Sequence, residues 1–148
     1  MNYPALAAEL LENMQMLRKA GPLKHINESL HGGAFVLQYI ACHGGDAIPS
    51  EISGEMSVSS ARIAAALNSL ESKGLITRQI DRSDRRKILV GITPEGKALA
   101  QRQRQAVIAG ASKMLALLGE EDAGEYIRIT RKLAEIMSAR EGENICCN

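Results

Sequence analysis

The sequence predicts a mainly α-helical fold that contains a helix-turn-helix, a small β-hairpin and flanking helices at both ends. Three observations predict it. Apolar residues recur at helical spacing along most of the 148 residues, whereas residues 75–92 carry two β-prone runs around a charged stretch. Only four residues are aromatic and none is Trp, so the core must come from Leu, Ile, Ala, Val and Met. Those side chains favour helices packed on helices.

Two helices are predicted before the helix-turn-helix. The first covers residues 4–20, where apolar side chains recur every three or four positions, and Gly21-Pro22 ends it. The second covers residues 28–43 and ends at Gly44-Gly45.

Two short helices joined by a tight turn follow. The first covers residues 49–56 and begins with Pro49, a residue suited to the first helical position. The second covers residues 59–73, with Ser59 placed to cap it and Gly74 to end it. Its inward face carries apolar residues at i, i+4 and i+7, namely Ile63, Leu67 and Leu70. This pairing is typical of a helix-turn-helix.

A β-hairpin is predicted next, with strands at residues 75–80 and 88–92 and a polar, basic tip at residues 81–87. A helix-turn-helix followed directly by a basic hairpin is a winged helix-turn-helix, and the hairpin is its wing.

After the wing, Thr93-Pro94-Glu95 opens a long helix, with Thr93 as the cap. Gly119 breaks this helix, and residues 120–139 form the last one.

Charge is unevenly distributed along the chain. The net charge is only +1, but the stretch from Arg62 to Arg104 holds ten basic and four acidic residues, a balance of +6 that leaves −5 elsewhere. A basic centre between acidic ends is typical of a polyanion-binding protein. A solvated charged face is the alternative that charge alone leaves open.

Several classes of protein are excluded. The N-terminus lacks a basic region and carries Glu9 and Glu12, unlike a secretory signal, and no apolar run approaches the roughly 18 residues of a membrane span. The three cysteines show no scaffold spacing, and no nucleophile elbow, P-loop or paired-carboxylate motif is present. We therefore expect a cytoplasmic protein that is not an enzyme, with no cofactor, no metal and no membrane partner.

Three motifs occur together in the middle of the chain: Leu-Glu-x-x-Gly-Leu-Ile at residues 70–76, Asp-Arg-Arg at residues 84–86 and Ile-Thr-x-x-Gly at residues 92–96. On these motifs, the stretch from Ile48 to Leu99 resembles the MarR family of bacterial transcription regulators. The flanking helices match the family in number and length, although more loosely.

The resemblance implies a single winged-helix regulator over residues 1–148. Residues 45–96 would bind DNA, while the helices at residues 1–30 and 97–140 would intertwine to form a homodimer. It also implies a recognition helix in the major groove, a wing in the minor groove and a cleft for a small-molecule effector. The expected function is that of a ligand-responsive repressor that binds a near-palindromic operator in double-stranded DNA, since a two-fold dimer reads two half-sites.

The predicted DNA contacts on the recognition helix follow from side-chain chemistry. Ser59 and Ser60 lie where a helix start meets a phosphate. Arg62 is the one long base-reading side chain on the front half of the helix. The family usually has hydroxyl or basic side chains mid-helix, where this chain has alanines 64–66. Ala61 and Ala65 offer only methyl groups, which suit thymine.

On the wing, Arg86 occupies the family's tip position, where an arginine enters a narrow minor groove. Asp84 can orient its guanidinium through a bidentate pair. The remaining predicted contacts are basic side chains of the tip, namely Arg82, Arg85 and Lys87.

Cys42 has two interpretations. By default it is a small core thiol; alternatively it is a redox sensor, because oxidant-sensing family members use a cysteine near the effector cleft. A metal site that joins Cys42 and His43 to His25 or His31 is not predicted, since zinc-binding relatives use paired histidines after the wing, where this chain has none. Cys146 and Cys147 are expected to be free thiols in a frayed tail.

The rival from another class is a winged-helix adaptor that contacts proteins and binds no DNA. Such an adaptor has no need for a cluster of basic residues at the wing tip or for the central charge of +6.

Overall fold

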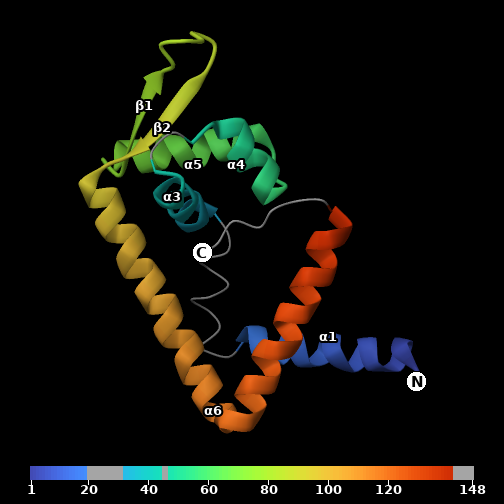
Figure 1. Ribbon diagram of the computed structural model, residues 1–148. Coiled ribbons are helices and arrows are strands. Elements are labelled where there is room, and N and C mark those ends of the chain that lie inside the picture. Colours follow the sequence, from blue (N-terminus) through green and yellow to red (C-terminus); the bar gives the residue numbers. More distant parts are fainter. Residues whose placement is uncertain (20–31, 45–46, 142–148) are drawn as a thin grey trace. The chain divides into compact units, whose positions relative to one another are not determined.

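The computed structural model of the chain describes residues 1–19, 32–44 and 47–141 (Figure 1). The elements in chain order are α1 (Tyr3–Lys19), α3 (Gly32–Cys42), α4 (Pro49–Met56), α5 (Ser60–Ser72), β1 (Ile76–Ile80), β2 (Ile88–Ile92) and α6 (Pro94–Glu141). The chain divides into two compact units, Met1–Gly110 and Ala111–Asn148, with the boundary inside α6. The predicted winged helix-turn-helix with flanking helices is confirmed. The end of the first predicted helix and the start of the second fall within residues 20–31, which lie outside the described residues, as does the tail at residues 142–148.

The hydrophobic core lies among α3, α4, α5, the hairpin and the start of α6. The predicted inward face of α5 is confirmed, since Ile63, Leu67 and Leu70 are all buried. They pack with buried residues of the neighbouring elements, namely Val36, Leu37, Ile40, Ala47, Ile52, Ile76, Val90 and Ala100. We call this set of elements, with the first two turns of α6, the winged lobe.

A tight turn joins α4 to α5. Ser57 takes a left-handed conformation (φ 51°), and the Ser53 hydroxyl donates to the Val58 carbonyl at 2.6 Å. Ser59 has the extended backbone of a cap residue, but its hydroxyl makes no cap hydrogen bond, so the predicted side-chain cap is wrong. Instead, the Ser59 carbonyl accepts the amides of Arg62 and Ile63, which starts the helix through backbone bonds alone.

The wing is an antiparallel hairpin in which Ile76 pairs with Ile92, Arg78 with Val90, and Ile80 with Ile88. The Val90 amide also donates to the Ala47 carbonyl at 2.9 Å, which ties the base of β2 to the segment before α4.

Three residues lock the end of α5 to the start of α6. Gly74 ends the helical segment in the left-handed conformation (φ 69°), as predicted. The Thr93 hydroxyl donates to the Gly74 carbonyl at 2.7 Å and accepts the Gly96 amide at 3.0 Å, so Thr93 is confirmed as the cap of α6. A β-carbon at Gly96 would overlap the Leu75 carbonyl, so only glycine fits this approach of two backbones.

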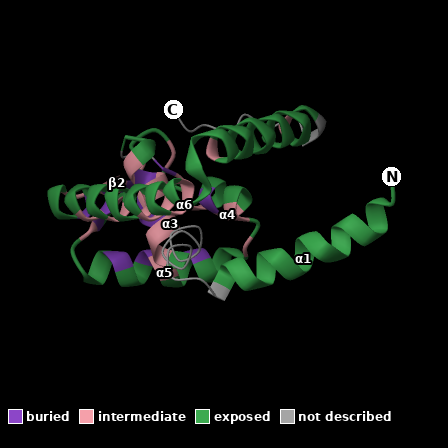
Figure 2. Ribbon diagram, turned by 90° about the horizontal axis from the view of Figure 1, so that it is seen from below, coloured by how far each residue is buried: buried purple, intermediate pink, exposed green. Residues whose placement is uncertain are grey.

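The long helices contrast with the winged lobe. The described side chains of α1 are all exposed, including Leu6, Leu10 and Met14 (Figure 2). α6 is interrupted at Gly119, whose φ of 78° and ψ of 172° are not helical, as predicted. Beyond it, Leu133 and Met137 are among the large apolar residues that remain exposed.

Candidate nucleic-acid interface

The first turns of α5 and the residue before them present the predicted contact residues to solvent. Arg62 is exposed there among small side chains, so the helix surface is narrow and carries one long cation. The other predicted residues on this element are also exposed, namely Ser59, Ser60, Ala61 and Ala65. A helix face of this kind can enter a groove closely, while its buried side fixes it to the lobe.

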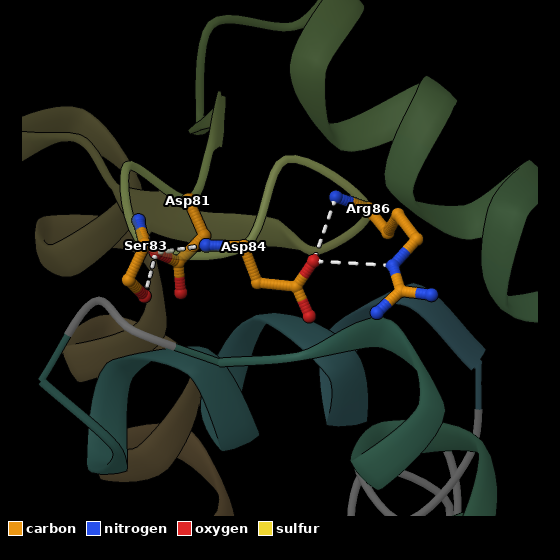
Figure 3. Close-up of polar contacts among 4 residues, drawn as sticks. All are labelled: Asp81, Ser83, Asp84 and Arg86. Carbon is orange, nitrogen blue, oxygen red and sulfur yellow. Dashed lines mark hydrogen bonds and ion pairs between the residues drawn. The ribbon is translucent and has the colours of Figure 1, made fainter.

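Asp81 organises the tip of the wing (Figure 3). Its Oδ1 accepts the Ser83 amide at 2.7 Å, the Ser83 hydroxyl at 2.6 Å and the Asp84 amide at 3.3 Å. The Ser83 hydroxyl, followed by the Ser83 amide, holds the pKa of Asp81 below its ordinary value, because these donors stabilise the carboxylate. The sequence analysis missed this role, although an Asp two residues before a Ser is a known signal for such a turn.

Asp84 contacts Arg86 through a single carboxylate oxygen. Its Oδ1 accepts the Arg86 backbone amide at 3.1 Å and lies 3.4 Å from the Arg86 Nε (Figure 3). The predicted bidentate pair is therefore wrong, because the same oxygen serves the backbone and leaves one weak contact to the side chain. The Arg86 side chain is 93% exposed. Asp84 holds the Arg86 backbone and leaves the guanidinium uncovered.

The other cations of the tip, Arg82, Arg85 and Lys87, are exposed as well. The two acids of the tip are half-buried and accept hydrogen bonds from the tip itself. The surface that the wing offers to a partner is therefore positive, and its chemistry suits phosphates and groove edges rather than catalysis.

Cys42 is exposed at the end of α3, so its interpretation as a core thiol is wrong. Val36, Leu37 and Ile40 of α3 are buried in the core. Cys42 is the last residue of this helix and lies beyond the buried part. The Gln38 Nε2 donates to the Cys42 Sγ at 3.4 Å. His25 and His31 lie outside the described residues, and within the described ranges no three His, Cys, Asp or Glu side chains gather to hold a metal.

The described residues of the winged lobe line at least two cavities. One of about 260 Å³ lies between α3, α4 and α5 and has Phe35, Glu55 and Arg62 in its lining. The other, of about 320 Å³, lies between α3, α5 and α6 and is lined by Leu37, Leu70 and Leu99 together with Lys73 and Gln103. Among the described residues, the buried Oε1 of Gln103 has no hydrogen-bond partner.

Comparison with known proteins identifies the family. The profile of the MarR family matches residues 34–88, which include most of α3, the helix-turn-helix and most of the wing. The HTH-type transcriptional regulator YwhA of Bacillus subtilis is 31% identical over 128 residues, which cover 84% of this chain and 87% of YwhA. The chain belongs to the MarR family.

Two further comparisons cover most of the chain. The HTH-type transcriptional repressor MdtR of Bacillus subtilis is 32% identical over 111 residues, which cover 75% of this chain and 71% of MdtR. The crystal structure of YusO from the same organism superposes with a TM-score of 0.68 at 27% identity and covers 91% of this chain and 99% of YusO.

This MarR-family protein is a DNA-binding transcription regulator and not an enzyme. No helix in the described part of the chain is long and apolar enough to cross a membrane.

Proposed function

We propose that the protein is a sequence-specific, ligand-responsive repressor that binds a near-palindromic operator as a homodimer. The exposed basic wing tip carries this proposal, because Asp81 and Asp84 order the tip and leave Arg86 93% exposed. An ordered arginine at the end of a projecting hairpin suits a narrow minor groove, which concentrates negative potential.

In this proposal α5 is the recognition helix. Ser59 and Ser60 contact phosphate, Arg62 reads one guanine, and Ala61 and Ala65 contact thymine methyl groups. Wing contacts to the DNA come from Arg82, Arg85, Arg86 and Lys87, with Asp84 holding Arg86 in place. A helix with so few polar side chains leaves much of the specificity to groove shape.

Exposed apolar side chains support the homodimer. In α1, Leu10 and Leu17 are 57% and 48% exposed, and in α6, Leu133 is 56% exposed. Exposed apolar residues in such number mark an interface, and a second copy of the chain offers the same helices for pairing. We therefore assign residues 1–30 and 97–140 to dimerisation and residues 45–96 to DNA binding.

The cavity between α3, α5 and α6 supports an effector. Its apolar lining with Lys73 and the unpartnered Gln103 Oε1 suits a small amphipathic molecule. Repression is proposed because a relative, MdtR, is named a transcriptional repressor. We place the protein in the cytoplasm, with the chromosomal DNA that it would control.

The test measures binding to the DNA immediately upstream of the protein's own coding region. Fluorescence anisotropy at near-physiological salt gives the affinity. We expect Arg86→Ala to weaken binding by about 1–3 kcal/mol. Arg128→Ala removes a cation from the second half of α6, outside the winged lobe, and is expected to leave affinity unchanged. Equal binding by the parent and Arg86→Ala would contradict the wing contact, and absence of binding to any genomic fragment would favour the adaptor function.

The exposure of Cys42 favours a second candidate, an oxidant-responsive regulator. If this thiol is the sensor, peroxide will change the DNA affinity of the parent and leave that of Cys42→Ser unchanged. A variant that carries Cys146→Ser and Cys147→Ser controls for the tail, and a response lost only in this variant would exclude Cys42.

A further inference from the structure

Arg78 lies in the middle of β1, between the packed base of the wing and its tip. Ile76, Arg78 and Ile80 alternate along one face of β1, and their exposure rises towards the tip, from 2% for Ile76 to 25% for the Arg78 side chain and 65% for Ile80. On β2, Val90 opposite Arg78 is fully buried, whereas Ile88 opposite Ile80 is 43% exposed. Arg78 is therefore the side chain at the border between the packed base of the wing and its solvent-exposed end.

The guanidinium of Arg78 contacts the last turns of α5. Its Nη2 donates to the Asn68 Oδ1 at 2.6 Å, and its Nε lies 3.5 Å from the Glu71 Oε2. Asn68 and Glu71 are three residues apart, so they stand side by side on one face of the helix. Arg78 thus links β1, the first strand of the wing, to α5, the helix that carries Arg62.

We propose that Arg78 is a positioning residue for DNA binding, which fixes the wing against α5 so that both reach their grooves together. The inference rests on the proposed function, in which Arg86 enters the minor groove and α5 the major groove. A planar guanidinium can contact Asn68 and Glu71 at the same time and so fix the direction of β1 relative to α5. A single ammonium group cannot do this. Without this contact, the exposed end of the wing keeps its own turn but loses its orientation towards the helix.

The experiment is a double-mutant cycle on affinity for the upstream DNA fragment, measured at one fixed salt concentration. The four proteins compared are the parent, Arg78→Met, Arg86→Ala and the double variant. Met keeps an unbranched apolar stem and offers no donor to Asn68 or Glu71. In the parent, Arg86→Ala is expected to weaken binding about tenfold. With Arg78→Met present, the same change is expected to cost less than about twofold, because the misdirected wing no longer holds Arg86 in the groove.

Arg62→Ala is the matched control for the cycle. Its loss of affinity is expected to be the same with and without Arg78→Met, because Arg62 lies on the helix and not on the wing. Thermal unfolding of each variant shows whether it is folded. If Arg78→Met does not fold, Asn68→Ala removes the same hydrogen bond from an exposed helix position and is expected to show the same non-additivity with Arg86→Ala.

The inference is overturned if Arg86→Ala costs the same factor in both backgrounds. That additive result would make Arg78 an independent contact, such as one to a phosphate, and would leave the proposed function intact. If Arg86→Ala has no effect even in the parent, the proposed wing contact fails and the inference fails with it.

Discussion

The winged lobe and the long helices bury their apolar residues to very different degrees. In the lobe, Leu37, Ile52 and Val90 are at most 1% exposed and belong to one hydrophobic core. In α1, Leu11 is 61% exposed, and in α6, Leu117 is 83% exposed. The lobe therefore closes its own hydrophobic core within one chain, whereas the helices carry apolar surface that stays exposed among the described residues.

The difference separates two kinds of partner. The basic excess of +6 lies between Arg62 and Arg104, a stretch that covers nearly all of α5 and the whole wing, and the wing tip carries exposed cations. The long helices α1 and α6 instead expose leucine, isoleucine and methionine. A polyanion suits the first region, and a second copy of the chain suits the second.

The largest effect on DNA affinity is expected from a substitution that disrupts the proposed dimer interface in the long helices and leaves the winged lobe intact. Tyr126, Ile129, Leu133 and Ile136 recur at spacings of three and four residues and are 44–56% exposed. We expect Leu133→Glu to convert the proposed dimer to a monomer, as measured by sedimentation. Operator affinity is then expected to fall by about two orders of magnitude, because each lobe binds its half-site alone.

Arg131→Glu is the control for that substitution, since position 131 lies on the opposite side of the helical repeat from position 133. It is expected to keep the dimer. A Leu133→Glu protein that stays dimeric and binds DNA like the parent would remove the distinction between the two regions.

A second substitution acts inside the lobe. Gly96→Ala places a β-carbon against the Leu75 carbonyl, so the start of α6 must shift away from the end of α5. We expect this overpacking to lower the free energy of unfolding by about 1–3 kcal/mol, measured by urea denaturation. Gly54→Ala is the matched change in open space within α4, and it is expected to be stabilising by about 0.5–1 kcal/mol. Equal effects would show that the junction is not closely packed.

The smallest effect concerns the wing tip. The folded-state pKa of Asp81 lies below its ordinary value, so its ionised form stabilises the turn at neutral pH. This contribution is present above the ordinary aspartate pKa of about 3.9 and is lost as pH falls through the lowered value.

An NMR titration of the Asp81 carboxyl carbon measures this shift. The midpoint is expected below the ordinary value, and Ser83→Ala is expected to raise it, since the Ser83 hydroxyl is the largest cause. Ser72→Ala, whose hydroxyl bonds only to its own helix turn at Ser69, is expected to leave it unchanged. A midpoint that Ser83→Ala does not move would assign the shift to another group.

The sequence predicted those features that depend on local pattern. The helix Pro49–Met56, the strands of the wing and the break at Gly119 follow from periodicity and from residues with special backbone preferences, and the structure has them. Thr93 was recognisable as a cap because the Thr-Pro-Glu signature is local.

Features that depend on distant neighbours were missed or wrong. Arg78 and Asn68 are ten residues apart, and only the packing of β1 on α5 brings them together. Cys42 follows the apolar pattern of a buried residue, but the helix ends there and the thiol is exposed. Gly96 belongs to a sequence motif whose physical reason, contact with the Leu75 backbone, needs both segments in place.

The central claim is that one chain carries a DNA-reading lobe and a dimerising helix region, and hydroxyl-radical footprinting of the bound upstream fragment tests it most directly. The account predicts two protected segments on one face of the duplex, related by two-fold symmetry and about one helical turn apart, because two lobes held by one dimer read two half-sites. A single asymmetric protected segment, or protection with no sequence preference along the fragment, would contradict it.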